Sequence, residues 1–161
     1  MTDKLFRAYD KGRKEYLSDG HLFIAINKSR HPNKSEIYLD MISNADKYKD
    51  RFVIEQYTGI TDKNGKKIFE GDILKYDIWG SYECFAVVRI GEYEQDGSGN
   101  EYPAIKIYGV YAEVKKYYSL FKEDEDYFPE YLKTSSLLEI GIENFELVGN
   151  IHDNLELIKT T

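Results

Sequence analysis

The chain has 161 residues, of which 42% are hydrophobic and 32% charged, a balance typical of a globular protein with one core. The apolar runs, such as 22–26 and 85–88, are far shorter than the roughly 20 residues that cross a membrane as a helix, so no membrane anchor is predicted. The single cysteine, Cys84, excludes an internal disulfide and favours a reducing, cytoplasmic setting.

The net charge of −7 is distributed unevenly along the chain. Residues 1–75 carry 15 Lys and Arg against 12 Asp and Glu, a net +3, whereas residues 76–161 carry 7 against 17, a net −10. A surface of the second kind repels phosphate backbones, which argues against broad nucleic-acid binding. The slightly basic first part could still hold a local nucleic-acid-binding site.

The first 50 residues predict a β-hairpin region followed by a short helix. Residues 5–9 alternate in the manner of a strand, Asp10–Arg13 supplies a turn in which Gly12 is free to take positive φ, and 14–17 returns as a second strand. A further strand is expected at 21–27. Apolar residues at spacings of three to four predict an amphipathic helix at 35–48, and the alternative there is an irregular connector.

The most informative feature is a tight hairpin in the middle of the chain. Residues 52–57 alternate as a strand, which Thr58 and Gly59 end or kink, and the turn 62–65 then ends in Asn64-Gly65, the dipeptide that left-handed hairpin turns favour. Residues 66–69 form the returning strand. A break at 70–72 is followed by a further strand at 73–76. This alternation of strands and breaks is typical of a sheet that curls into a small barrel.

Four further strands are predicted, at 82–90, 104–114, 137–142 and 145–151, and the tail 154–161 ends in a last turn or frays. The aromatic and acidic stretch around 115–136 is interpreted as an insertion with a short helical turn. We therefore predict a mainly β protein of the α+β class: a small, strongly curved antiparallel β-barrel over residues 51–161, for which an SH3-like barrel is one candidate form. An N-terminal β-rich lobe, 1–50, precedes it, with one or two short helices.

Three blocks of the sequence resemble the YopX family, whose members are encoded mostly by phages and prophages. Residues 56–73, QYTGITDKNGKKIFEGDI, resemble the central family motif, and residues 6–10, FRAYD, resemble its opening motif, with Tyr9 where a Trp is common. Residues 148–157, VGNIHDNLEL, resemble its closing motif, with Leu155 where Pro is expected. The blocks occur in the family's order and extend over nearly the whole chain.

The resemblance implies a β-rich barrel fold of phage origin that self-associates in the cytoplasm of a bacterial host. It supplies no established activity and no catalytic residue. We expect the motif residues to serve the architecture, with glycines at turns and close approaches and with Asp62, Asp72 and Asn150 capping turns. These motif residues are Phe6, Arg7, Tyr57, Thr58, Gly59, Asp62, Asn64, Gly65, Glu70, Gly71, Asp72, Gly149 and Asn150.

Patterns for known site chemistry are incomplete in this chain, so no metal, cofactor or catalytic residue is predicted. Asp96, Ser98 and Asn100 have the spacing of a calcium loop, but Glu101 and Ile107 stand where Gly and Glu are required. The three histidines lack a zinc-binding spacing, no Gly-x-Ser-x-Gly elbow is present, and the glycines at 97 and 99 lack the third glycine of a dinucleotide site. The acidic run 123–126 is interpreted as a solvated face.

The sequence leaves three functional hypotheses, of which a non-enzymatic, self-associating binding protein with a phage or host partner leads. The abundant tyrosines suit a subunit interface, and the alternative is that they are edge and core residues of the barrel. A nucleic-acid-associated accessory protein is the second hypothesis, and an enzyme with an unrecognised carboxylate site is the third. Candidate phosphate contacts for the second are Arg7, Arg13, Lys14, Lys63, Lys66 and Lys67.

Overall fold

The structure, a computed structural model, describes residues 6–17, 50–95, 103–120 and 128–159. The chain divides into two compact units, Met1–Tyr57 and Thr58–Thr161, each described here by itself. The predicted strand at 21–27, the predicted helix at 35–48, the calcium-like loop from Asp96 to Glu101 and the acidic run 123–126 lie outside the described residues.

The first unit contains the predicted N-terminal hairpin. Strand β1 (Phe6–Asp10) pairs antiparallel with β2 (Glu15–Tyr16) and with β3 (Phe52–Thr61), whose last residues belong to the second unit. Gly12 is free to take positive φ but does not, and the left-handed residue of this turn is Lys14, at φ 57°. The Gly12 amide instead donates a hydrogen bond to the Asp10 carboxylate.

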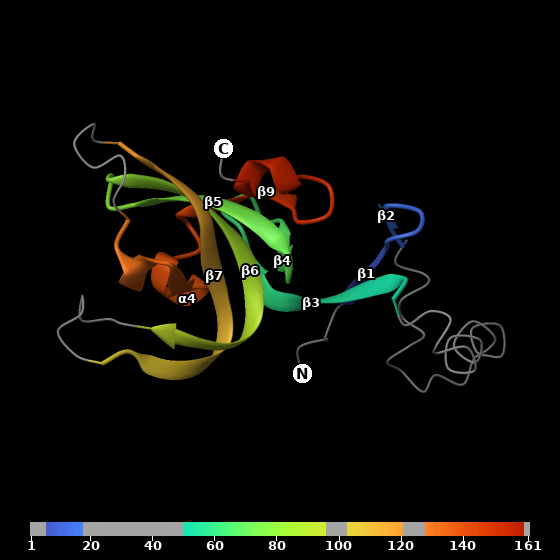
Figure 1. Cartoon of the computed structure of the whole chain (residues 1–161), viewed down its shortest axis with the longest axis horizontal. Coiled ribbons are helices and arrows are strands. Elements are labelled where there is room, and N and C mark those ends of the chain that lie inside the picture. The colour runs from blue at the N-terminus through green and yellow to red at the C-terminus, as the bar shows by residue number, and fades with distance from the viewer. Residues whose placement is uncertain (1–5, 18–49, 96–102, 121–127, 160–161) are drawn as a thin grey trace. The chain divides into compact units, whose positions relative to one another are not determined.

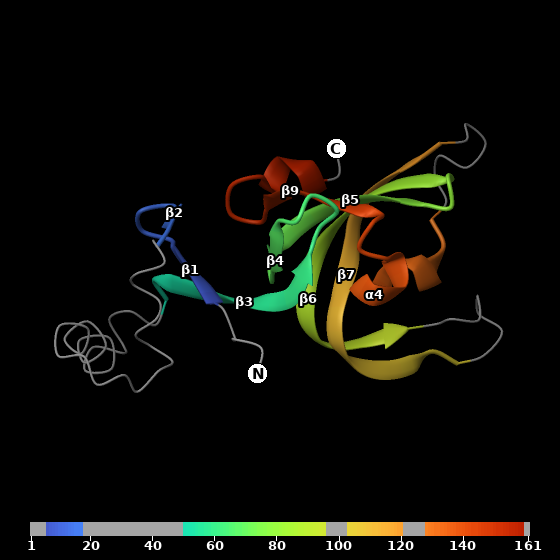
Figure 2. The same cartoon turned by 180° about the vertical axis from the view of Figure 1, so that it is seen from behind.

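The second unit is built on a five-stranded antiparallel sheet in the order β8-β7-β6-β5-β9. The sheet curls into a half-barrel, and helix α4 (Leu137–Ile140) lies inside its curve in both views (Figures 1 and 2). A short strand, β4, pairs with β3. The bounds of the strands are β4 Lys67–Phe69, β5 Asp72–Ile78, β6 Tyr82–Gln95, β7 Ile105–Ser119, β8 Thr134–Ser136 and β9 Phe145–Asn150.

The curvature of this sheet comes from two irregularities in strand pairing. The register shifts between Ile73 and Leu74 where β5 meets β9, and between Phe85 and Ala86 where β6 meets β7. An extra residue on one strand increases the local twist, so such shifts bend a sheet toward closure. The predicted mainly β fold with a strongly curved antiparallel sheet and few, short helices is thereby confirmed.

The core of the second unit lies between the curled sheet and the elements inside its curve. Alternation along β5 buries Leu74, Tyr76 and Ile78, while Phe145 of β9 is completely buried against them. From inside the curve, Leu132 and Leu137 complete the same cluster. These side chains hold the sheet and helix α4 together through burial of apolar surface.

The prediction of a strand at 137–142 was wrong. Residues 137–140 form helix α4, whose first turn is capped by Ser136, because the Ser136 hydroxyl accepts a hydrogen bond from the Leu138 amide. Gly141, at φ 84°, ends the helix. A short apolar run fits a buried strand and a buried helical turn equally well, so its periodicity alone does not separate them.

Another boundary also differs from the prediction. Strand β7 continues to Ser119, so residues 115–119 belong to the sheet and not to the predicted insertion. Gly59, at φ 85°, kinks β3 without ending it, which was one of the two alternatives. The expected helical turn of the insertion is the 3-10 helix η2 (Glu130–Leu132), and the expected last turn is η3 (Leu155–Ile158).

Replacing Gly65 with valine is expected to destabilise the second unit by about 1–2 kcal/mol. Gly65 has φ 78°, and a Cβ at this position would meet nothing within 4 Å, so the cost comes from the backbone conformation and not from a clash. Asparagine tolerates the left-handed region, so Gly65→Asn is the matched control and should lose less stability. Urea unfolding of both variants measures the difference. Equal stability of the valine variant and the wild type would show that this turn does not require a left-handed residue.

Candidate functional site

Asp62 joins the central hairpin to the last strand of the sheet. Its Oδ1 accepts hydrogen bonds from the amides of Asn64 (2.9 Å) and Lys66 (2.8 Å), while its Oδ2 accepts one from the amide of Leu147 in β9 (3.1 Å). Burial raises the pKa of the Asp62 carboxyl, but the amides of Leu147, Lys66 and Asn64 outweigh that effect and hold it below its usual value. A single carboxylate thus fixes the turn and covers part of the outer edge of β9.

The turn between β4 and β5 is held in a similar way. Asp72 is almost completely buried, and its Oδ2 accepts a hydrogen bond from the Phe69 amide at 2.8 Å. Gly71 donates its amide to the carbonyl of Val88 and accepts from the amide of Ile151 at 3.0 Å. Glu70 belongs to the same turn. These contacts connect the turn to β6 and to the end of β9.

The closing motif forms a third turn. The Oδ1 of Asn150 accepts hydrogen bonds from the amides of His152 (2.9 Å) and Asp153 (3.0 Å). Gly149 packs so closely on Asn154 that a Cβ would lie 2.5 Å from the Asn154 Oδ1. Close approach, and not positive φ, is therefore what this glycine provides.

Thr58, another motif residue, lies in the second unit beside the hairpin. The Thr58 hydroxyl donates to the carbonyl of Ile68 in β4 at 2.8 Å and accepts from the Ile60 amide at 3.2 Å. Like the side-chain oxygens of Asp62, Asp72 and Asn150, the Thr58 hydroxyl bonds to backbone groups. These hydrogen bonds connect the central and closing motifs to backbone groups of the second unit.

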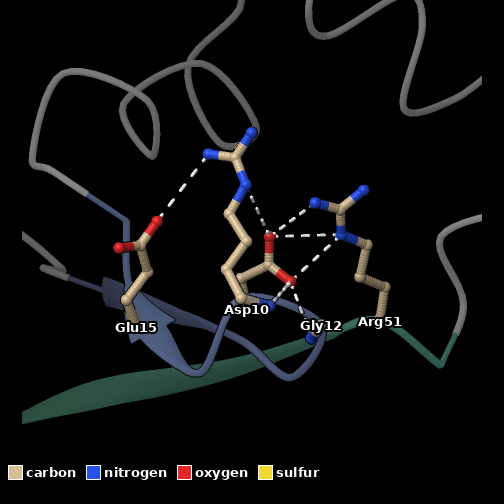
Figure 3. A network of polar contacts seen from close by, with 5 residues as sticks. Asp10, Gly12, Glu15 and Arg51 are labelled. Atoms are coloured by element: carbon tan, nitrogen blue, oxygen red, sulfur yellow. Dashed lines mark hydrogen bonds and ion pairs between the residues drawn. The ribbon is translucent and has the colours of Figure 1, made fainter.

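The first unit contains a buried carboxylate that sequence reasoning missed. Asp10 is 1% exposed, and the Arg51 guanidinium reaches it at 2.7 Å from Nη2 and 3.1 Å from Nε. Dashed lines in Figure 3 mark these contacts. The amides of Gly12 (2.9 Å) and Arg13 (3.2 Å) donate to the same carboxylate. The Arg51 hydrogen bonds and these amides lower the pKa of Asp10 from 3.8 to about 2, against the opposing effect of burial.

This lowered pKa predicts an acid-sensitive first unit. Because the folded pKa is depressed, the stabilisation by the Asp10 carboxylate is complete above about pH 4 and is lost as the pH falls through about 2. Urea unfolding followed from pH 6 to pH 2 should therefore show a stability gap between wild type and Asp10→Asn that closes toward pH 2. Glu15→Gln, at an exposed neighbour, is the control. A gap of constant size over this range would contradict the assignment.

A second buried carboxylate in the first unit is paired with a motif residue. Glu55 is 2% exposed, and its Oε2 accepts hydrogen bonds from the Arg7 Nε at 2.6 Å and from the Tyr16 hydroxyl at 3.1 Å. The Arg7 guanidinium also lies over the Tyr16 ring, 4.6 Å from its centroid. Phe6 and Tyr57, the other motif residues of this unit, are partly buried on β1 and β3.

The six predicted phosphate contacts do not share one environment. Arg7 is paired with Glu55, Arg13 lies 3.7 Å from Glu15, and Lys63 lies 2.8 Å from Glu146. The side chains of Lys14, Lys66 and Lys67 are exposed. Arg7, Arg13 and Lys63 therefore already have a carboxylate partner within the chain.

The second unit contains a cavity of about 460 Å³ that sequence reasoning also missed. It opens between the end of β5, the turn after it, η2, β8 and α4. Its apolar lining comes from Ile78, Leu132 and Ile140. Its polar and aromatic lining is Tyr76, Asp77, Trp79, Ser135, Glu139 and Asn144.

Trp79 is placed at this cavity by a strained turn between β5 and β6. Trp79 and Gly80 both have positive φ, 53° and 67°, and the Ser81 amide donates to the carbonyl of Ile78 at 2.9 Å. The Asp77 carboxylate accepts a hydrogen bond from the Gly80 amide. The Trp79 side chain is 76% exposed. The signal for this site was present in the sequence as the only Trp of the chain, directly before a Gly and between two strands.

The thiol of Cys84 is not accessible to a substrate. It is completely buried in β6, and burial, followed by the charges of Asp77 and Glu83, raises the pKa of its thiol to about 12. Within the described residues, no three His, Cys, Asp or Glu side chains are arranged to hold a metal ion. None of the helices described is long and apolar enough to cross a membrane.

Comparison with known proteins gives one family. The chain is similar to protein EF1440 from Enterococcus faecalis in its crystal structure, with 22% identity, a TM-score of 0.45, and 99% of this chain and 100% of that chain covered. Curated proteins provide no match. The family model described as YopX protein matches residues 5–159, nearly the whole chain. This protein therefore belongs to the YopX family.

Proposed function

We propose that this YopX-family protein is a non-enzymatic binding protein of phage or prophage origin that works in the cytoplasm of the bacterial host. It self-associates and presents the cavity beside Trp79 to a phage or host protein partner. The cavity, with Trp79 at 76% exposure, is the observation that carries the proposal.

The placement of Trp79 favours recognition over stability. A bulky residue with left-handed backbone costs roughly 1–2 kcal/mol, and an exposed indole recovers little of that by burial. Tryptophan is enriched among the residues that dominate binding energy at protein interfaces. An exposed Trp79 in this conformation is therefore explained by a contact made outside the unit.

Partner capture from a phage-induced host lysate tests the binding half of the proposal. Tagged wild type, Trp79→Asn and the exposed control Glu156→Gln are compared at equal amounts of folded protein. We expect wild type and Glu156→Gln to retain the same partner, and Trp79→Asn to lose at least nine tenths of it. If all three proteins retained equal amounts of the partner, the cavity beside Trp79 would not be the binding site.

Self-association is supported by the outer edge of β7. Strand β8 pairs only with Tyr111–Glu113 of β7, so among the described residues the segment 105–110 has a strand partner on its β6 side alone. Ile105 and Tyr108 of this segment are 63% and 78% exposed. Open strand edges with exposed large side chains pair readily with another chain.

Light scattering at micromolar concentration tests the assembly half. The wild type should give the mass of an oligomer, and Tyr108→Lys should shift the equilibrium toward monomer by placing a charge at the edge. Lys106→Gln, a polar change on the same strand, is the control. A wild type that is only monomeric would refute self-association.

The exposure of some carboxylates and the pairing of others with arginine support the non-enzymatic part of the proposal. Asp77 and Glu139, the two that line the cavity, are exposed, whereas a catalytic acid or base is usually tuned by burial. The buried carboxylates Asp10 and Glu55 are each held by an arginine. Both pairs stabilise structure and leave no charge to act on a substrate.

Nucleic-acid binding is kept as a second, weaker candidate because Lys14, Lys66 and Lys67 are exposed. Binding through these lysines would weaken steeply as salt rises, since each phosphate contact releases counterions. A mobility shift with single- or double-stranded DNA or RNA at low salt, lost in a Lys66→Gln/Lys67→Gln variant, would support this candidate. The absence of any shift at low salt would eliminate it.

A further inference from the structure

We propose that the cavity beside Trp79 binds the cationic head of a lysine or arginine side chain presented by a protein partner. The inference rests on the proposed function and specifies the chemistry of its site. Three features of the cavity support it: an uncompensated pair of carboxylates, an exposed indole, and an apolar wall that suits an aliphatic stem.

The charge of the cavity is negative and unbalanced. Asp77 and Glu139 line it, and none of the described lining residues is Lys, Arg or His. Among the described parts of the chain, neither carboxylate takes part in an ion pair: Asp77 accepts from the Gly80 amide, and Glu139 accepts from the Gln95 side-chain amide. A ligand with a positive charge would supply the missing partner, and ionised hydrogen bonds of this kind are among the stronger ones.

The indole of Trp79 adds a second attraction for a cation. Among aromatic side chains, the face of Trp attracts ammonium and guanidinium groups most strongly. Carboxylates and an indole in one cavity therefore select a cation over a neutral or anionic group. The apolar lining by Ile78, Leu132 and Ile140 suits the methylene stem that both Lys and Arg carry behind the charge.

Tyr76 contributes a buried aromatic residue to the lining of the cavity. It lines the cavity and is 3% exposed, and its hydroxyl has no hydrogen-bond partner among the described residues. Burial raises the pKa of this hydroxyl far above its ordinary value, so it stays protonated. The volume of about 460 Å³ lies within the range of small-ligand pockets, which is about 300–1,000 Å³.

The single Trp provides a direct optical probe, because the whole chain contains no other indole. The full-length protein is titrated with Nα-acetyl-arginine amide and Nα-acetyl-lysine amide while Trp79 fluorescence is recorded. Nα-acetyl-citrulline amide, a neutral compound of nearly the same shape as the arginine amide, is the matched control. We expect a saturable change with a Kd on the order of millimolar for at least one cation, and at least about tenfold weaker binding of the citrulline compound.

Two conservative variants test whether the cavity carboxylates supply the negative charge that binds the cation. Asp77→Asn keeps an acceptor for the Gly80 amide, and Glu139→Gln keeps a polar group near Gln95, so both variants should fold. Each should bind the cation about tenfold more weakly, whereas Glu156→Gln, outside the cavity lining, should bind as the wild type does.

Three results would overturn the inference: no saturable response to either cation, equal binding of the citrulline compound, or unchanged binding by both cavity variants. These results are distinguishable from failure of the proposed function. If partner capture still depends on Trp79 while the cations do not bind, the protein has a binding site at the cavity that recognises another chemistry. If capture is also independent of Trp79, both the site and its chemistry are wrong.

Discussion

Replacing Arg7 with methionine is expected to lower the free energy of unfolding of the first unit by about 3 kcal/mol. The substitution removes the guanidinium that donates to Glu55 at 2.6 Å, while the Glu55 carboxylate stays almost completely buried, at 2% exposure. A buried carboxylate that loses its cation keeps its desolvation cost without the compensating attraction. Urea unfolding followed by far-ultraviolet circular dichroism measures the loss.

The double variant Arg7→Met/Glu55→Met is the control for this prediction. With both charges gone, neither is left uncompensated, and its stability should return to within about 1 kcal/mol of the wild type. The single and double variants together separate a structural ion pair from a phosphate contact. If Arg7→Met left the stability unchanged but weakened nucleic-acid binding, the structural assignment of Arg7 would be wrong.

Replacing Asp62 with alanine is expected to destabilise the second unit by about 3 kcal/mol. Three backbone amides, those of Asn64, Lys66 and Leu147, lose their acceptor at once. Asp62 is 4% exposed, so water has little access to replace the lost carboxylate. The loss should appear in urea unfolding at pH 7, where the lowered pKa of Asp62 keeps the carboxyl ionised in the wild type.

Asp153→Ala is the matched control for Asp62→Ala. Asp153 is an exposed aspartate in another turn, where its carboxylate accepts a hydrogen bond from the Asn150 side-chain amide at 3.0 Å. Its loss should cost no more than about 0.5 kcal/mol, as is usual for an exposed position. Equal effects of the two substitutions would mean that the contacts of Asp62 to the hairpin and to β9 do not stabilise the unit.

The turns were predictable from sequence because their chemistry is local. Gly65 supplies a left-handed residue, and Asp62 and Asp72 accept hydrogen bonds from amides two to four positions away, so residue type and spacing suffice to place these turns. The contact of Asp62 with Leu147, 85 positions away, is not local in this sense. The sequence predicted that Gly149 serves a turn or a close approach, but only the structure shows that the residue it approaches is Asn154. Helix α4 was mistaken for a strand because four residues are too few for a period to show.

The buried ion pairs and the cavity were not predictable because they depend on distant pairings. Asp10 and Arg51 are 41 positions apart, and Arg7 and Glu55 are 48 apart, so only the register of β1 with β3 brings them together. The cavity combines β5 with α4, two elements far apart in the chain. Its lining includes none of the motif residues, so the feature that identifies the family is separate from the feature that supports a function.

Trp79 is proposed to serve binding and not folding. The free energy of unfolding of Trp79→Asn, measured in urea against the wild type, tests whether folding needs the indole. Asparagine adopts the left-handed conformation that Trp79 has, at φ 53°, with less strain, and the indole that it replaces is 76% exposed. We predict a stability equal to that of the wild type or higher by up to about 1 kcal/mol. A loss of more than about 1 kcal/mol would make Trp79 a structural residue and contradict its proposed role in binding.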